Sequence, residues 1–367
     1  MLSNPMASLA AKQASKDTAN KKIIWVVLRG AMDSLHAVVP IGDPDLFTHR
    51  KTLVQPIADQ LLPLNKYFGL HPSFTHMHQW YQQGQMLPIV AVASPYRSRS
   101  HFDAQDMLES GLTITDHESG WLARAFAHYQ GEALAISRSL PISMRGTKTV
   151  RTWYPSALPD VEQDLYDRLA SLYANDAIFS ARLKEGLETK NMLSMEGNNK
   201  KNPKFLHLAK NCGELLANNR NANCAMLEMG GWDTHNAQVN RLKRQFTELD
   251  NSLKALRDKL GSEWNNTVVI VATEFGRTVK VNGTKGTDHG TASAMFMAGG
   301  AVAGGKVLGQ WPGLSQDKLY QLRDLQPTSD IRQWLATLLQ QHWHLSTHQL
   351  NSIFPKVGLS KQRLINA

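Results

Sequence analysis

Apolar runs that lead into acidic residues or histidines constrain this 367-residue chain most strongly. The runs are IIWVVLRG before Asp33, CAMLEMGG before Asp233 and His235, VVIVAT before Glu274, and SAMFMAGG, which follows Asp288 and His289. Such β-rich apolar runs are typical of buried strands in a mainly parallel sheet. Because functional side chains of open α/β folds gather at the carboxyl ends of the strands, we expect a site at one sheet edge.

Carboxylate and imidazole groups at one sheet edge make a metal site the first hypothesis. Each residue also has a simpler explanation. Asp33 could cap a turn after Gly30, and Asp233 could cap the helix that begins near His235. Their joint appearance after separate apolar runs favours a shared site. Because no thiolate is among these groups, Zn, Mn, Mg and Ca all remain open as the divalent metal.

The composition is that of a globular protein with a large core, since 42% of the residues are hydrophobic and 19% are charged. No linker-like stretch or repeat divides the chain, so we expect a single domain over residues 21–367. Residues 1–20 lack the basic start and apolar centre of a complete signal peptide. We expect a disordered lead-in there, or the stub left after an export signal is removed. No apolar run reaches the ~18 residues that a membrane helix needs.

The net charge of +9 suits an anionic partner, but the 40 Lys and Arg residues are scattered along the chain. Nucleic-acid binding needs a basic face with interleaved aromatic residues, which the sequence lacks, so we do not expect it. A small anionic ester substrate suits the charge equally well. Cys212 and Cys224 form no metal-binding or disulfide pattern and are expected to be buried thiols. The sequence does not indicate an oligomeric state.

Strand-like and helix-like segments alternate along most of the chain, which predicts a three-layer α/β sandwich. The predicted strands are 23–28, 87–93, 134–139, 224–229, 268–273, 294–298 and 306–309. The predicted helices are 73–83 with a serine cap, 120–128, 160–218 with a break at 197–203, 235–260, and a C-terminal helix that Ser329 or Asp330 caps and that runs to residue 342. The regularly spaced leucines of 235–260 predict core packing.

Ser100 is the candidate nucleophile. In PYRSRSHFDAQDMLESG it follows a predicted strand and precedes a helix that begins near Phe102. A strand-to-helix turn at this position would expose the serine hydroxyl at the sheet edge. Ser100 and Asp103 also fit the spacing of a helix capping box, which needs no catalytic role. Both roles can hold at once.

Several motifs together resemble the bacterial domain-of-unknown-function family 1501. They are LRGAMDSLHAVVP, GLHPSF, SRSHFDAQDMLESG, GWLARAF, GGWDTHNAQ, TEFGRTVKVNGTKGTDHG, the glycine pair at 299–300 and PTSDIR at 327–332. They extend in order from about residue 23 to residue 355. This family is often carried by twin-arginine-exported proteins. It is similar to the superfamily of alkaline phosphatases, sulfatases and cofactor-independent phosphoglycerate mutases, and the resemblance implies an alkaline-phosphatase-like fold.

The superfamily resemblance implies an esterase with two metal ions. Asp33 would bind one metal, Ser100 would be the nucleophile, and the residues at the second metal would be Asp233, His235 and His289. The final strand of the superfamily normally ends in an Asp-His pair, whereas here it ends in Glu274 and Phe275. Because phenylalanine cannot bind a metal, we expect one site to be weak, singly occupied, or completed by His101 or Asp288.

The resemblance therefore implies a metal-dependent hydrolase of phosphate or sulfate esters, with one or two divalent ions. Arg277 or Arg99 could clamp the equatorial oxygens of the transferred group, and a structural salt bridge explains Arg277 equally well. A non-catalytic binding module with a degenerate metal site is an alternative that Phe275 supports. A metal-dependent phosphomutase or transferase is another. The family resemblance implies a periplasmic or exported protein, although a cytoplasmic one stays possible without a visible signal.

Overall fold

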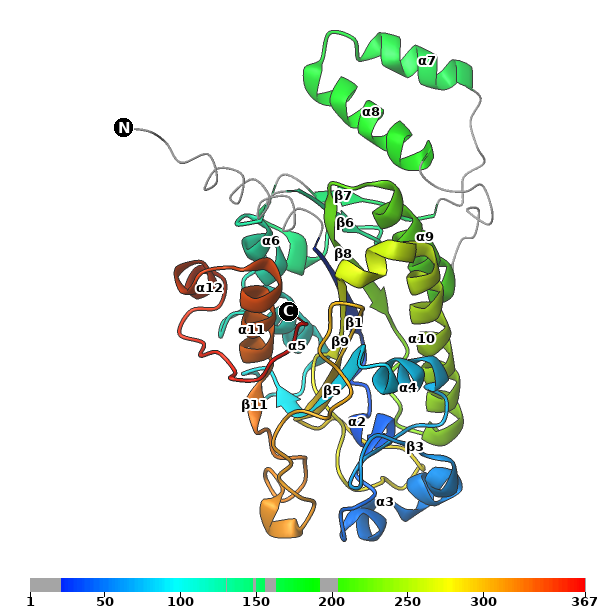
Figure 1. Ribbon diagram of the computed structural model, residues 1–367, viewed down its shortest axis with the longest axis vertical. Coiled ribbons are helices and arrows are strands. Elements are labelled where there is room, and N and C mark those ends of the chain that lie inside the picture. Colours follow the sequence, from blue (N-terminus) through cyan, green and yellow to red (C-terminus); the bar gives the residue numbers. More distant parts are fainter. Residues whose placement is uncertain (1–20, 130, 148–149, 156–162, 192–203, 367) are drawn as a thin grey trace.

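A mainly parallel sheet forms the centre of the protein (Figure 1). The computed structural model describes residues 21–129, 131–147, 150–155, 163–191 and 204–366. In this part of the chain the 8-stranded sheet has the order β11 (Ser329–Asp330), β5 (Met86–Ala93), β10 (Ser293–Ala298), β9 (Thr267–Thr273), β1 (Lys22–Leu28), β8 (Ala222–Met229), β6 (Glu132–Ala135) and β7 (Val150–Thr152). β10 is antiparallel to β5 and β9, and the other pairings are parallel.

The central strand β1 is buried along its whole length because both faces of the sheet are covered. Ile24, Val26 and Leu28 pack into the core on one face. Ile23, Trp25 and Val27 pack into the core on the other. A strand buried on both faces needs a continuous apolar run, which is the pattern that the sequence shows.

Helices cover the two faces of the sheet (Figure 1). One face carries α4 (Thr75–Gln82), α9 (Phe205–Asn218) and α10 (Gln238–Leu260). The other carries α5 (His101–Ser110), α6 (Trp121–Phe126), α11 (Ile331–Trp343) and α12 (Thr347–Ile353). The apolar stripe of α10 is buried in the first of these layers, as its spacing predicts. The three-layer α/β prediction is therefore confirmed.

Some predicted element boundaries were wrong. α10 begins at Gln238, not at His235, because loop 282–286 takes the hydrogen bonds that would extend the helix. The amides of Ala237 and Gln238 donate to the carbonyls of Thr284 and Lys285. α4 begins at Thr75 and has no serine cap. The predicted strand 306–309 is reduced to one bridge between Ile89 and Leu308.

Smaller elements complete the described chain. They are α2 (Ser34–Ala37), α3 (Leu46–Val54), α7 (Gln163–Leu172), α8 (Ala177–Asn191), and a small sheet of β2 (Val38–Val39), β4 (Gly69–Leu70) and β3 (Leu62–Pro63). The described residues contain no helix long and apolar enough to cross a membrane. Both cysteine thiols are buried and unpaired, as predicted. The predicted lead-in at 1–20 and the predicted break at 197–203 lie outside the described residues.

Candidate metal centre

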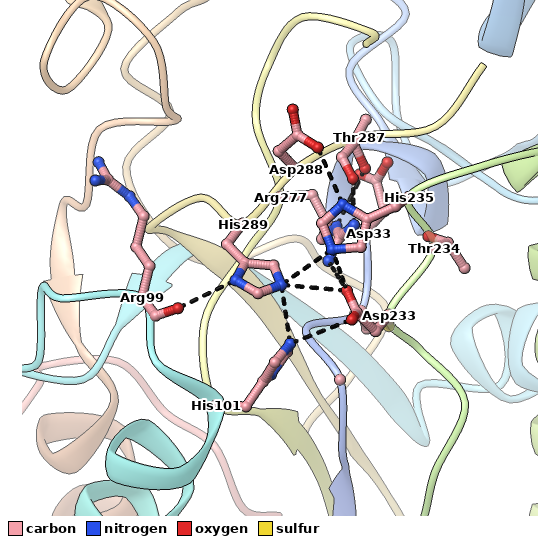
Figure 2. Close-up of polar contacts among 12 residues, drawn as sticks. Asp33, Arg99, His101, Asp233, Thr234, His235, Arg277, Thr287, Asp288 and His289 are labelled. Carbon is pink, nitrogen blue, oxygen red and sulfur yellow. Dashed lines mark hydrogen bonds and ion pairs between the residues drawn. The ribbon is translucent and has the colours of Figure 1, made fainter. Parts of the chain in front are cut away.

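Four side chains from three separate segments meet at the predicted edge of the sheet (Figure 2). His101 begins α5, the segment that follows β5. Asp233 and His235 follow β8, and His289 lies in the connection between β9 and β10. β5, β8 and β9 are parallel, so their carboxyl ends share one edge, and the antiparallel β10 starts there. The sheet topology therefore brings the four side chains together.

The polar atoms of this group face one another. Nε2 of His289 lies 3.0 Å from Nε2 of His101 and 3.2 Å from Nε2 of His235. Asp233 Oδ1 lies 2.9 Å from Nε2 of His235 and 3.2 Å from Nε2 of His289. One ligand atom each from His101, Asp233 and His289 can be chosen so that all lie within 4.8 Å of one another. These three residues surround a position that a single metal ion fits, and Nε2 of His235 lies beside it.

In each of the three histidines, the other ring nitrogen already has an acceptor. Nδ1 of His101 lies 2.7 Å from Glu274 Oε1, and Nδ1 of His235 lies 3.0 Å from Asp288 Oδ1. Nδ1 of His289 lies 3.1 Å from the carbonyl oxygen of Arg99. Because these oxygens only accept, a neutral ring carries its proton on Nδ1 and leaves a lone pair on Nε2. Lone pairs that face each other at these distances require a proton or a cation between them.

The donor set therefore fits a metal ion. Imidazole nitrogens with one carboxylate suit Zn²⁺ better than Mg²⁺ or Ca²⁺, which prefer oxygen ligands. A second group that orients each imidazole is the usual surrounding of a histidine ligand. Of the predicted ligands, Asp233 and His289 face this position together with His101, and His235 lies beside it. Glu274 and Asp288 instead hold histidine rings.

Glu274 is a buried anchor for His101. Its Oε1 also accepts hydrogen bonds from the amide of Gly30, at 2.8 Å, and from Nε2 of Gln105, at 2.9 Å. Burial alone would raise the pKa of Glu274, but the hydrogen bonds, led by that from His101, hold it below the usual range. In turn, the hydrogen bond to Glu274 raises the pKa of His101. The carboxylate therefore increases the basicity of this ring.

Arg277 holds Asp233 in place. Nη1 of the arginine donates to Asp233 Oδ1 at 2.6 Å, and its other nitrogens donate to Thr287. Burial would raise the pKa of Asp233, but the hydrogen bond and the charge of Arg277 lower it. The Arg277 side chain has no exposed surface. This burial and the bond to Asp233 favour the structural salt bridge, one of the two predicted alternatives for Arg277.

Asp33 was predicted to bind a metal, but the structure places it in a buried ion pair with Arg50. The two guanidinium nitrogens of Arg50 donate to the two carboxylate oxygens at 3.0 and 2.5 Å. The side chain of Gln238 and the amide of Leu35 donate to the same carboxylate. Both carboxylate oxygens thus accept hydrogen bonds from protein groups, and these contacts favour a structural role for Asp33 over the predicted metal-binding role. Arg50 was missed because it belongs to no recognisable motif.

Ser100 immediately precedes α5 and its ligand candidate His101. Its side chain makes no capping hydrogen bond, and Asp103 accepts instead from the hydroxyl of Tyr96. The predicted capping box is therefore wrong. Arg99 has a φ of +62°, which is unusual outside glycine and turns its carbonyl toward His289.

The guanidinium of Arg99 points away from His289 in Figure 2 and pairs with Asp324 at 2.7 Å. In this structure Arg99 therefore contacts the site through its backbone carbonyl, and its guanidinium is paired with Asp324. Phe275, which departs from the superfamily pattern, stacks on the ring of His101 with centroids 4.9 Å apart. Phe275 cannot bind a metal, but it packs against the ring of the candidate ligand His101.

The fold and the site define an α/β protein with a cluster of histidine and carboxylate side chains suited to a metal ion. The chain belongs to the family described as "Protein of unknown function (DUF1501)", which matches residues 20–354. This confirms the family that the motifs indicated. No curated protein matches the chain.

Several solved structures are similar over much of the chain. The C-terminal periplasmic domain of EptC from Escherichia coli, in complex with Zn, has 9% identity and a TM-score of 0.44, with 94% of this chain and 92% of that chain covered. A protein in the alkaline phosphatase superfamily from Vibrio parahaemolyticus has 11% identity and a TM-score of 0.38, with 88% and 66% covered. Murine ectonucleotide pyrophosphatase/phosphodiesterase 5 has 13% identity and a TM-score of 0.32, with 70% and 57% covered.

Proposed function

We propose that this protein is a metal-dependent hydrolase of a small phosphate or sulfate ester. The observation that supports it most is that ligand atoms of His101, Asp233 and His289 lie within 4.8 Å of one another, with Nε2 of His235 beside Asp233 and His289. The proposed ligands are His101, Asp233, His235 and His289, with Zn²⁺ as the favoured ion. A divalent cation held there would act as a Lewis acid that offsets negative charge on the reacting ester.

The site is open enough to admit a substrate. The side chain of Asp233 is 43% exposed and that of His235 is 42% exposed. The positive end of α5, a helix of 10 residues, starts beside the cluster and favours an anionic group. Access of water supports hydrolysis over the phosphomutase alternative, because a mutase has to shield its transferred group from water.

Ser100 is the proposed nucleophile. Its oxygen would form a bond to phosphorus or sulfur while its proton passes to solvent, and the bond to the leaving ester oxygen would break as that oxygen takes up a proton. Water would then cleave the covalent serine ester and restore the hydroxyl. The position of Ser100 next to His101, with a hydroxyl that does not cap the helix, supports this role.

The test begins with elemental analysis of protein purified without chelator, followed by assays on phosphate and sulfate monoesters and diesters. We expect close to one metal ion per chain and turnover of at least one ester class that is lost on chelation. Metal without turnover on any ester would favour the non-catalytic binding module. A protein that takes up no divalent metal would contradict the proposed centre.

The serine is tested by comparing Ser100→Ala with Ser98→Ala, a change to a neighbouring exposed serine. Ser100→Ala should lower kcat by at least about 10³-fold and leave the metal content unchanged. Ser98→Ala should retain both. Full activity in Ser100→Ala would show that serine is not the nucleophile.

We also propose that the protein acts outside the cytoplasm, as the family resemblance implies. Two buried, unpaired cysteines are compatible with either compartment. Fractionation of cells that produce the protein should recover it with periplasmic or secreted marker enzymes. Recovery with cytoplasmic markers would contradict the proposed location.

A further inference from the structure

Gln238 links the buried ion pair of Asp33 and Arg50 to the candidate metal centre. It is the first residue of α10, and its side chain has no exposed surface. Its Nε2 donates to Asp33 Oδ2 at 2.5 Å. Its Oε1 accepts from the hydroxyls of Thr287, at 2.6 Å, and Thr234, at 3.0 Å. The oxygen and one N–H of this side-chain amide therefore have hydrogen-bond partners.

A continuous series of hydrogen bonds runs from this amide to Asp233. Arg277 Nε donates to Thr287 Oγ1 at 3.2 Å, while Nη1 of the same guanidinium donates to Asp233 Oδ1 at 2.6 Å. Thr287 donates onward to Gln238, and Gln238 donates onward to Asp33. From Nε of Arg277 onward, each donor points toward the carboxylate of Asp33, whose charge Arg50 balances, whereas Nη1 of Arg277 donates in the other direction, to Asp233.

The direction of these bonds fixes the orientation of each polar group. Asp33 can only accept, so Gln238 must present its N–H₂ to it and its oxygen to the threonines. Thr287 then has lone pairs left for the guanidinium of Arg277. Thr287 and Gln238 are fully buried and Arg277 is only 2% exposed, so water does not readily replace a missing partner.

We propose that Gln238 is a positioning residue for the metal centre, a role that rests on the proposed function above. Through Thr287 it fixes the guanidinium of Arg277, which holds Oδ1 of Asp233. Asp33 is the far anchor of this relay and not a metal ligand. The amide suits the position because a carboxylate would lie against Asp33, and an apolar side chain would remove one donor from Asp33 and the acceptor of the Thr287 hydroxyl.

The experiment measures the Zn²⁺ affinity of the full chain by competition with a chromophoric chelator, together with the absorption spectrum of the Co²⁺-loaded protein. Gln238→Met keeps the length of the side chain and removes both polar groups. Thr287→Val keeps the shape and removes the hydroxyl. Each should lower the Zn²⁺ affinity by about 10- to 100-fold and shift the Co²⁺ bands, while one ion still binds at saturation.

The double variant separates a relay from two independent defects. The double variant combines Gln238→Met with Thr287→Val. If both residues act through Arg277, its Zn²⁺ affinity should be close to that of the single variant with the lower affinity. The matched control is Gln341→Met, which removes a half-buried amide that bonds to Gln362 and Leu364 away from the site. It should lower the melting temperature without changing the affinity.

The outcomes are distinguishable. Wild-type protein that binds neither Zn²⁺ nor Co²⁺ would contradict the proposed metal centre, and with it the proposed function. Wild-type binding together with an affinity within about twofold in both single variants would overturn only the positioning role, as would losses that add fully in the double variant. Melting curves of each variant show that it is folded at the temperature of the assay.

Discussion

The Nε2 atoms of His101 and His289 lie 3.0 Å apart, although the Nδ1 atom of each ring already has an acceptor. Two neutral imidazoles in these tautomers direct lone pairs at each other, which is unfavourable in the absence of a proton or cation. The arrangement is stable once a metal ion accepts both lone pairs. The metal affinity therefore depends on this pair and on the groups that orient its rings.

Replacement of His289 should abolish tight metal binding. His289 is the central residue of the cluster, since its Nε2 contacts His101, His235 and Asp233. We expect His289→Ala to lower the Zn²⁺ affinity by more than about 100-fold, beyond the loss from an outer partner. Calorimetric titration measures this. His128→Ala, at an exposed residue that contacts Ser352, is the control and should bind as the wild type does.

Removal of the charge on Glu274 should change both the titration of His101 and the affinity for metal. The carboxylate raises the pKa of His101, so Glu274→Gln should lower that pKa, as followed by NMR in metal-free protein. The Zn²⁺ affinity should fall about 10- to 100-fold because the ring loses its orienting partner. An unchanged histidine titration would contradict the assigned contact.

Asp33→Asn should destabilise the protein without removing the metal. The change leaves the buried charge of Arg50 uncompensated, which typically costs about 3–5 kcal/mol. Urea denaturation should show this loss in the free energy of unfolding. Elemental analysis should still find one bound ion at saturation, because both oxygens of Asp33 already accept hydrogen bonds from Arg50. Asp258→Asn, at an exposed pair with Lys254 on α10, should change the stability little. Loss of metal stoichiometry in Asp33→Asn would instead support the predicted role of Asp33 as a ligand.

The buried ring of His36 should make the protein sensitive to acid. Burial lowers the pKa of His36 to about 4, an effect that the charge of Asp33 opposes and that of Arg50 reinforces, while His71 packs beside it with centroids 5.1 Å apart. Above pH 6.5 both folded and unfolded forms are neutral. Below it the unfolded form takes up the proton first, so stability falls as the pH falls toward about 4.

The contribution of His36 to this loss is roughly 3 kcal/mol, because each unit of pKa difference corresponds to about 1.4 kcal/mol. His36→Phe, which fills the same apolar surroundings, should make the free energy of unfolding less dependent on pH in this range. Urea denaturation at several pH values measures it. An equally steep dependence in the variant would exclude His36 as a source.

Much of the fold could be predicted because buried parallel strands need long apolar runs, and those of β1, β8 and β9 are unmistakable. The start of α10 could not. Its first amides are taken by loop 282–286, a tertiary contact that local spacing does not reveal. The same holds for Ser73, whose hydroxyl bonds to the carbonyl of Lys243 instead of capping a helix.

The sequence by itself determined that acidic and histidine side chains gather at one edge of an α/β sheet, because the ends of parallel strands share that edge. Only the tertiary structure decided which of them face one position and which support the others. A carboxylate at the end of a strand, such as Asp33, binds whichever cation the fold brings nearest. Here that cation is Arg50 in helix α3, 17 residues further along the chain, which carries no signal in the sequence.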